Sequence, residues 1–224
     1  MTEAEARDWL SENFNVSRET RDRLEAFANF LGLEAQSQNL VSASTTDHIW
    51  SRHIADSAQL LQFVSTEAAP DRSWIDLGSG AGFPGIIIAL LSDFNVTLVE
   101  SRTRRIDYLQ RAVGMLGLEG SVSVAGMPLE RLETAPYSVI SARAFAPLPR
   151  LFDIAARFST DKTLWLLPKG RNAAKEWNEA QPVWNGDFRI ESSVTDSEAG
   201  ILVGHLTGKR SMTVAPAAKG QQKQ

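Results

Sequence analysis

Short apolar runs alternate with helix-length stretches from residue 73 onward, and this alternation restricts the possible folds more than any other feature of the sequence. Strands separated by helices in this way form repeated strand–helix units with a parallel sheet. The runs predict strands over 73–77, 95–100, 121–125, 137–141 and 162–167. The intervening stretches predict helices over 84–92, 102–117, 147–158 and 171–180.

Two later apolar runs, 188–194 and 200–207, have no helix-length segment between them. Strands joined this closely pair antiparallel, because a parallel connection needs about a dozen residues or more. We therefore expect a hairpin that closes one edge of the sheet. The fold class predicted is α/β, with a parallel sheet and an antiparallel hairpin, which is unusual for a dinucleotide-binding fold.

The first 70 residues are predicted to form a helical extension. Apolar side chains recur at helical spacing over 17–33 and 46–64. Ser17 opens no capping box, because the residue three positions further on is Thr20. The predicted organisation is a helical extension over 1–70, a sheet domain over 71–208 and a flexible basic tail over 209–224.

The absence of cysteine excludes several classes of protein at once. The chain has 224 residues, a net charge of -4 and no cysteine, which excludes disulfide scaffolds, cysteine-ligated zinc, iron–sulfur clusters and cysteine nucleophiles. Its first residues lack the pattern of a signal peptide, and its longest apolar run, over 86–91, is too short to span a membrane. We expect a cytoplasmic protein of one domain with an appendage.

A glycine-rich turn joins the first predicted strand to the helix that follows it. Its glycines, Gly78, Gly80 and Gly82, alternate along the chain after an acid, Asp76. Glycine is needed where the backbone turns sharply or lies against a ligand. A dinucleotide fingerprint would have a small residue where this chain has Phe83, which disfavours an NAD-dependent oxidoreductase.

The strand after this turn ends in Glu100, 24 residues beyond Asp76. A carboxylate at this place accepts charge-assisted hydrogen bonds from both hydroxyls of a ribose. The order of strand, turn, helix, strand and acid favours a nucleoside-containing ligand over a plain surface turn.

The turn resembles motif I of the Rossmann-like class I methyltransferases that depend on S-adenosylmethionine. Further segments lie before and after it, namely Asn-Leu-Val-Ser at 39–42, Arg-His-Ile-Ala-Asp-Ser at 52–57, Phe-Pro-Gly at 83–85, Ser-Ala-Arg-Ala-Phe at 141–145 and Pro-Lys-Gly at 168–170. In this order the chain resembles, over about residues 20–207, the bacterial 16S rRNA guanine-N7 methyltransferases of the RsmG family (GidB, glucose-inhibited division protein B). The resemblance implies that 71–208 is a methyltransferase domain.

The resemblance also implies an activity, which is methyl transfer from S-adenosylmethionine to N7 of guanine 527 in the 530 loop of 16S rRNA, within a small-subunit particle. By position, the family's cofactor-contacting residues correspond to Gly78, Phe83, Leu129, Glu130 and Arg143. The turn and the following acid add Ser79, Gly80, Gly82 and Glu100 to the predicted cofactor site.

The sequence departs from the family's pattern at one point. Where the family has Arg-small-Glu after the third strand, this chain has Pro128, Leu129 and Glu130, followed by Arg131. We consider Arg131 as the substitute for the missing arginine.

Methylation of N7 requires neither a general base nor a metal ion, because N7 of guanine carries a free lone pair and no proton. No acid or base catalyst is therefore assigned, and catalysis is expected to come from positioning. The candidate RNA contacts are Asn39, His53, Asp56, Arg143, Phe145 and Lys169. Alternatives stay open for several of them: His53 and Asp56 equally suit hydrogen bonds between the extension and the sheet domain, and Phe145 suits core packing.

The acidic net charge argues against binding to RNA, but the charge is unevenly distributed. Residues 141–175 carry seven basic and two acidic side chains, so we expect modest, salt-dependent RNA binding. Two other functions remain alternatives: methylation of a small molecule with the same cofactor, in which the N-terminal helices form a lid, and a non-catalytic nucleotide-binding module.

Overall fold

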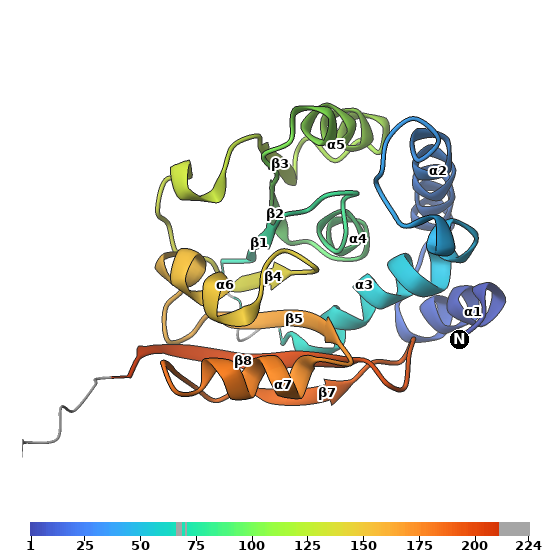
Figure 1. Ribbon diagram of the computed structural model, residues 1–224. Helices are drawn as coiled ribbons and strands as arrows, with labels where there is room; N and C mark the ends of the chain where they lie inside the picture. Colours follow the sequence, from blue (N-terminus) through green and yellow to red (C-terminus); the bar gives the residue numbers. More distant parts are fainter. Residues whose placement is uncertain (66–68, 70, 211–224) are drawn as a thin grey trace, which may run out of the picture.

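The computed structural model describes residues 1–65, 69 and 71–210 (Figure 1). The N-terminal elements are α1 (Glu3–Asn13), α2 (Arg18–Glu34), η1 (Ala43–His48), η2 (Trp50–Ala55), α3 (Asp56–Ala58) and η3 (Gln59–Phe63). The elements that follow are β1 (Ser73–Leu77), α4 (Gly85–Leu91), β2 (Asn95–Val99), α5 (Thr103–Met115), β3 (Val122–Ala125), η4 (Leu129–Arg131), β4 (Val139–Ala142), α6 (Leu148–Ala155), η5 (Ala156–Phe158), β5 (Leu164–Gly170), α7 (Ala173–Ala180), β6 (Trp184–Gly186), β7 (Arg189–Ser192) and β8 (Gly200–Lys209).

The strands form one sheet in the order β3-β2-β1-β4-β5-β8-β6, with β7 also paired to β8. Strands β1 to β5 are parallel, and β8 runs antiparallel to β5, β6 and β7. The predicted parallel strands and the hairpin of β7 and β8 are therefore confirmed. The short edge strand β6 was not predicted, because three residues give no periodic pattern.

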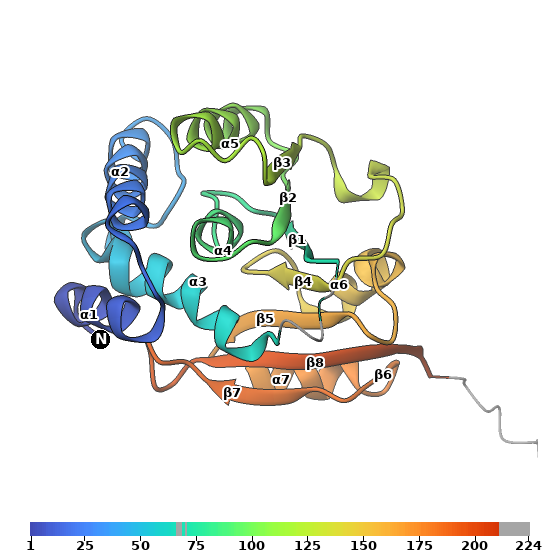
Figure 2. The same cartoon turned by 180° about the vertical axis from the view of Figure 1, so that it is seen from behind.

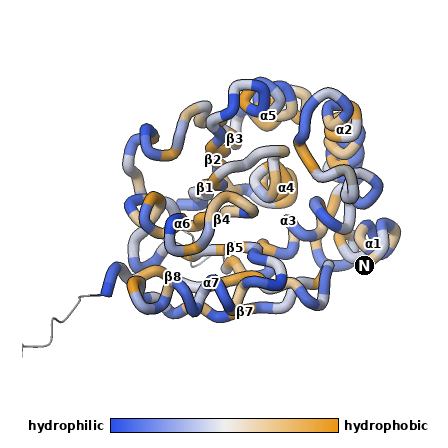
Figure 3. Tube along the Cα trace, viewed as in Figure 1, coloured by the Kyte–Doolittle hydropathy of each residue, from blue (hydrophilic) through white to orange (hydrophobic). Residues whose placement is uncertain are grey.

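Helices cover both faces of the sheet (Figures 1 and 2). On one face α4 packs against β1 and β2 and is covered by α2, whereas α5 lies beside β3; the apolar sequence of α4 appears as the hydrophobic trace at the centre of Figure 3. On the other face α6 and α7 cover β4, β5 and β8, with Phe152 and Trp165 among their fully buried contacts. Burial on both faces explains why the parallel strands have near-continuous apolar runs.

The N-terminal segment differs in part from its prediction. Helix α2 confirms the helix predicted over 17–33, and the Ser17 hydroxyl caps it by accepting from the Thr20 amide. Helix α1 was missed although Thr2 and Glu5 form a capping box, a signal that the sequence carries.

The single helix predicted over 46–64 is wrong in detail, because 3-10, π and α turns follow one another there. The π turn begins where α1 docks: the Glu3 carboxylate accepts from the backbone amides of Trp50 (3.0 Å) and Ser51 (2.8 Å). This contact with α1 holds the first backbone amides of the π turn in place. Because the contact joins distant parts of the chain, no local sequence pattern predicts the π turn.

One hydrophobic cluster extends from α1 and α2 through α4 to β8, so the predicted extension shares its core with the sheet domain. Of the predicted tail, residues 211–224 lie outside the described residues. Within the part of the chain that the structure describes, no helix is long and apolar enough to cross a membrane.

Candidate functional site

The glycine turn lies at the carboxyl end of β1, where the strand order reverses between β2 and β4. Open α/β sheets bind ligands at this edge, beside such a switch point. Gly78 and Gly80 have φ angles of 70° and 55°, a left-handed backbone that glycine adopts freely. Ser79 anchors the turn, because its amide donates to the Val99 carbonyl (3.0 Å) and its hydroxyl donates to the Asp76 carbonyl (3.0 Å).

The Asp76 carboxylate is fully buried and holds the turn from below. Its Oδ1 accepts from the Ser141 hydroxyl (2.8 Å), and its Oδ2 accepts from the Gly85 amide (3.2 Å). Trp74 Nε1 donates to the same Ser141 oxygen (2.8 Å). Burial raises the pKa of Asp76 to about 6, since desolvation outweighs the hydrogen bonds from Ser141 and Gly85 that favour the ionised carboxylate. Asp76 therefore supports the glycine turn from the interior of the protein and does not reach the surface.

A cavity of about 200 Å³ opens beside the turn. Glu100 lines it and is 6% exposed. Its Oε1 accepts from the amides of Ser101 (2.7 Å) and Arg102 (2.9 Å), whereas Oε2 lies 3.7 Å from Arg105 Nη1. A carboxylate has about four lone-pair sites, so Glu100 keeps acceptor capacity for ligand hydroxyls.

The other walls of this cavity are mixed, with Ser101, Arg102 and Arg105 supplying polar groups and the remaining residues supplying apolar surface. Val99, Met127 and Leu129 line it together with Gly78 and Phe145. The Phe145 ring lies against the turn, since a Cβ on Gly78 would meet Phe145 Cδ2 at 2.3 Å. This combination suits a planar base attached to a ribose.

The structure brings only part of the predicted cofactor set to the cavity. Gly78, Glu100 and Leu129 line it, whereas the remaining predicted residues are not among its lining: Ser79, Gly80, Gly82, Phe83, Glu130 and Arg143. The Phe83 ring is buried beneath the turn, 5.4 Å from the Phe27 ring and 5.1 Å from the His53 ring.

Arg131 does not line the cavity either, and its side chain is exposed at the end of η4. Two arginines from the start of α5, Arg102 and Arg105, line the cavity instead.

A larger cleft of about 740 Å³ adjoins this cavity, and the two share Ala144 and Phe145. One wall comes from the N-terminal segment, with His53 and Asp56, and the other from the carboxyl ends of β4 and β5, with Arg143 and Lys169. Four candidate RNA contacts from distant parts of the sequence, together with Phe145, thus line one cleft.

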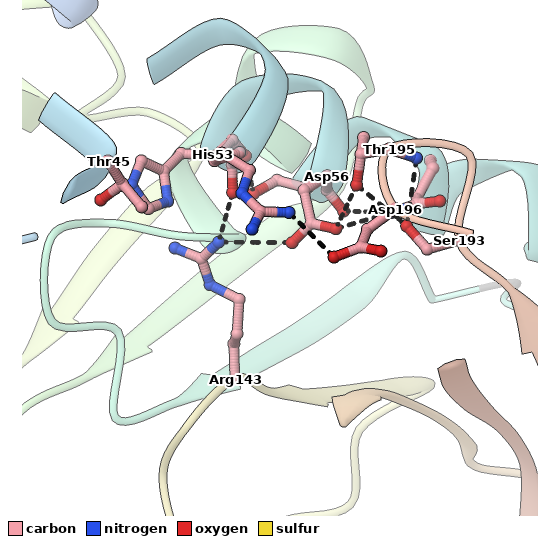
Figure 4. Close-up of polar contacts among 10 residues, drawn as sticks. Thr45, His53, Asp56, Arg143, Ser193, Thr195 and Asp196 are labelled. Atoms are coloured by element: carbon pink, nitrogen blue, oxygen red, sulfur yellow. Dashed lines mark hydrogen bonds and ion pairs between the residues drawn. The ribbon is translucent and has the colours of Figure 1, made fainter. Parts of the chain in front are cut away.

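Asp56 is the centre of a polar network in this cleft (Figure 4). Its Oδ1 accepts from Thr195 Oγ1 (3.0 Å) and Gln59 Nε2 (2.9 Å), and its Oδ2 accepts from Arg143 Nη1 (3.3 Å). Thr195 was not predicted as a site residue, because it lies 139 positions from Asp56 and only the folding of β7 and β8 brings it there. Gln59 lies three positions after Asp56, on the same helical turn. This spacing was the one signal in the sequence that could have indicated a residue of the network.

His53 points away from Asp56, toward Thr45, as Figure 4 shows. Its Nε2 lies 3.1 Å from Thr45 Oγ1, and no described residue forms a hydrogen bond with its buried Nδ1. Burial lowers the pKa of His53 to about 3, assisted by the positive charges of Arg143 and Arg52. The imidazole is therefore neutral at physiological pH.

Lys169 contacts the loop that carries Phe145 and that lines both cavities. Lys169 is 7% exposed, pairs with Glu176 Oε2 (3.0 Å) and donates to the Ala146 carbonyl (3.1 Å). Ala144 has a φ of 53°, so this loop bends through a conformation that side chains disfavour. Lys169 thus braces the loop that carries Phe145.

Asn39 lies apart from the other candidates, in a groove of about 550 Å³ between the end of α2 and the start of α5. Its carbonyl accepts from Arg105 Nη2 (2.9 Å). Arg102 and Arg104 line the same groove and form no ion pair within the described residues.

Ion pairs neutralise part of the basic segment over 141–175. Three of its arginines and lysines are paired, namely Arg143 with Asp56, Lys169 with Glu176, and Arg171 with Glu198. Within the described residues the other four basic side chains have no ion-pair partner, namely Arg150, Arg157, Lys162 and Lys175. Further unpaired positive charge lies in the groove at the start of α5. No group of three or more metal-ligating side chains occurs in the described ranges.

The motifs that carry the family resemblance all belong to these cavities or to their supports. A family model described as rRNA small subunit methyltransferase G (GidB) matches residues 20–203. The chain belongs to this family of rRNA methyltransferases. The resemblance inferred from short motifs is thereby confirmed.

Family members align along nearly the whole chain. The ribosomal RNA small subunit methyltransferase G of Zymomonas mobilis is 48% identical over 219 residues, which cover 95% of this chain and 98% of that protein. The corresponding protein of Rhizorhabdus wittichii is 51% identical over 223 residues, which cover 99% and 98%.

Solved structures share the fold at low sequence identity. An O-methyltransferase from Bacillus cereus in complex with SAH matches with a TM-score of 0.57 and 14% identity, covering 88% of this chain and 96% of that chain. The O-methyltransferase TomG from Streptomyces achromogenes in complex with SAM gives 0.58 and 14%, covering 92% and 96%. The predicted class I methyltransferase fold is confirmed.

Proposed function

We propose that the chain transfers a methyl group from S-adenosylmethionine to N7 of guanine in the 530 loop of 16S rRNA, acting in the cytoplasm on a small-subunit particle. The observation that supports this most directly is the junction of two cavities at Phe145. One of them has a ribose acceptor, Glu100, beside a glycine turn, and the other is a cleft open to a large substrate.

The residues of the smaller cavity fit the nucleoside part of the cofactor. Glu100 Oε2 lies 3.7 Å from Arg105 Nη1 and has lone pairs left for the ribose hydroxyls, and Val99 and Leu129 offer apolar surface to a planar ring. The Phe145 ring packs against the bare backbone of Gly78, where a Cβ would collide with it, so only glycine allows this close packing.

The chemistry requires little from the protein beyond positioning. Bound S-adenosylmethionine supplies a sulfonium methyl group, which N7 takes with its own lone pair while the carbon–sulfur electron pair returns to sulfur. His53 is neutral and lines the cleft, so it adds no positive charge beside a base that becomes cationic. Holding two reactants in line contributes up to about 7–11 kcal/mol in well-oriented systems.

The candidate RNA contacts divide into two groups. His53, Asp56, Arg143, Phe145 and Lys169 surround the cleft and suit a single unstacked base, because RNA is read at unpaired bases with aromatic stacking. Asn39 lies in the arginine groove, where a phosphate of the neighbouring backbone suits the unpaired Arg102 and Arg104.

The test uses small-subunit particles from cells that lack this methyl mark. Incubation with labelled S-adenosylmethionine is expected to yield 7-methylguanosine in the 530 loop, and a Glu100→Ala variant serves as the control for cofactor binding. Cofactor binding without labelled rRNA would contradict the substrate and favour the small-molecule alternative. No cofactor binding at all would leave the non-catalytic nucleotide-binding module.

A further inference from the structure

The Asp56 carboxylate is positioned as a ligand-binding group would be. Two neutral donors, from Thr195 and Gln59, occupy its Oδ1, whereas Oδ2 has one long contact, with Arg143 at 3.3 Å. The Asp56 side chain is 18% exposed and lines the cleft. Because a carboxylate oxygen has about two lone-pair sites, Oδ2 has one site left, and a second donor from the cleft can take the place of the long Arg143 contact.

From this geometry we infer that Asp56 reads the Watson–Crick edge of the target guanine, accepting hydrogen bonds from N1–H and N2–H. This inference rests on the proposed function. Guanine alone among the RNA bases presents these two donors side by side. Adenine has an acceptor at N1, so its lone pair would face the carboxylate charge.

The orientation of the base agrees with the position of the second cavity. N7 lies on the edge of guanine opposite N1 and N2. A base whose Watson–Crick edge faces Asp56 therefore directs N7 away from the N-terminal wall. The opposite wall contains Phe145, which the cleft shares with the cavity of Glu100 and Gly78.

The same contact strengthens during the reaction. When N7 gains the methyl group, the positive charge passes from sulfur to the base, and N1–H becomes more acidic. The hydrogen bond from N1–H to the Asp56 carboxylate therefore binds the transition state more tightly than the ground state, which raises kcat. Asp56 thus contributes to both specificity and rate.

The experiment compares guanosine with inosine, which lacks only the 2-amino group, at the target nucleotide of reconstituted small-subunit particles. The wild-type chain is expected to prefer guanosine in kcat/KM by about 10- to 100-fold, the effect of one hydrogen bond to a charged group. Asp56→Asn is expected to lower kcat on guanosine and to bring the preference close to one.

Asp196→Asn is the matched control. Asp196 is a second carboxylate that lines the same cleft, but it pairs with Arg52 at 3.0 Å, so its removal is expected to leave the guanosine preference unchanged. Binding of both particles in the presence of S-adenosylhomocysteine gives the same comparison without turnover, for a variant that is inactive on both.

A wild-type preference near one would overturn the inference, and so would an Asp56→Asn variant that loses activity or affinity equally on both particles, because a purely structural role predicts that result. Absence of methyl transfer by the wild-type chain to the guanosine particle would instead contradict the proposed function itself.

Discussion

Replacement of His53 by Gln is expected to remove a pH-dependent part of the stability. The imidazole is 8% exposed and lies 5.1 Å from the Phe83 ring, and burial lowers the pKa of His53 from 6.5 to about 3. The unfolded chain binds a proton at this residue near pH 6.5, whereas the folded chain does not. The corresponding stability is complete above pH 6.5 and is lost as the pH falls toward 3.

The magnitude follows from the two pKa values. Between pH 7.5 and pH 5 the wild-type chain loses about 2 kcal/mol of unfolding free energy through His53. The Gln variant keeps a polar group near Thr45 but binds no proton, so this loss is absent from it.

Asp76 acts in the opposite direction over the same range. Its pKa rises from 3.8 to about 6 in the folded chain, so the stability that it contributes is complete below pH 3.8 and is lost as the pH rises through 6. Between pH 7.5 and pH 5 it adds about 1 kcal/mol. The two effects partly cancel in the wild-type chain, and only the variants separate them.

The assay is urea unfolding at both pH values for the wild type, His53→Gln and Asp76→Asn, with the free energies extrapolated to water. His53→Gln is expected to gain about 2 kcal/mol relative to the wild type on going from pH 7.5 to pH 5, and Asp76→Asn to lose about 1 kcal/mol. A His53→Gln variant whose difference from the wild type is equal at the two pH values would refute the reasoning. An imidazole that titrates near pH 6.5 in the folded chain would do the same.

Four further substitutions test the site. Gly80→Leu places a side chain at a φ of 55° and is expected to abolish S-adenosylhomocysteine binding in calorimetry while costing about 1–2 kcal/mol of stability; retained affinity would contradict the role of the turn. Glu100→Gln removes the charge from the ribose acceptor and is expected to weaken the same binding about 10- to 100-fold with little change in Tm. Lys169→Ala removes contacts that hold the loop of Phe145 and is expected to weaken association with small-subunit particles, and unchanged association would exclude an RNA role for this edge. Arg104→Ala is expected to reduce the slope of log affinity against log salt by about 0.7–0.9 if one phosphate contact is lost, and an unchanged slope would remove the groove from the RNA surface.

The sequence by itself determined the fold class, the five parallel strands, the closing hairpin and the place of the glycine turn. These follow from local patterns: apolar periodicity, glycine spacing and an acid at a strand end. Glu100 was predicted for the same reason, because its role depends on its position relative to one strand and one turn. The motifs also sufficed to indicate the family.

The tertiary structure decided which predicted residues share a cavity. Phe83, adjacent to the glycines, packs into the core, whereas Asn39 lies in a separate groove with Arg102 and Arg104. Asp56 lies beside Thr195 because β7 and β8 fold back onto the N-terminal segment. Contacts across 139 positions leave no periodic trace in the sequence, since they depend on how packed elements meet and not on local backbone preference.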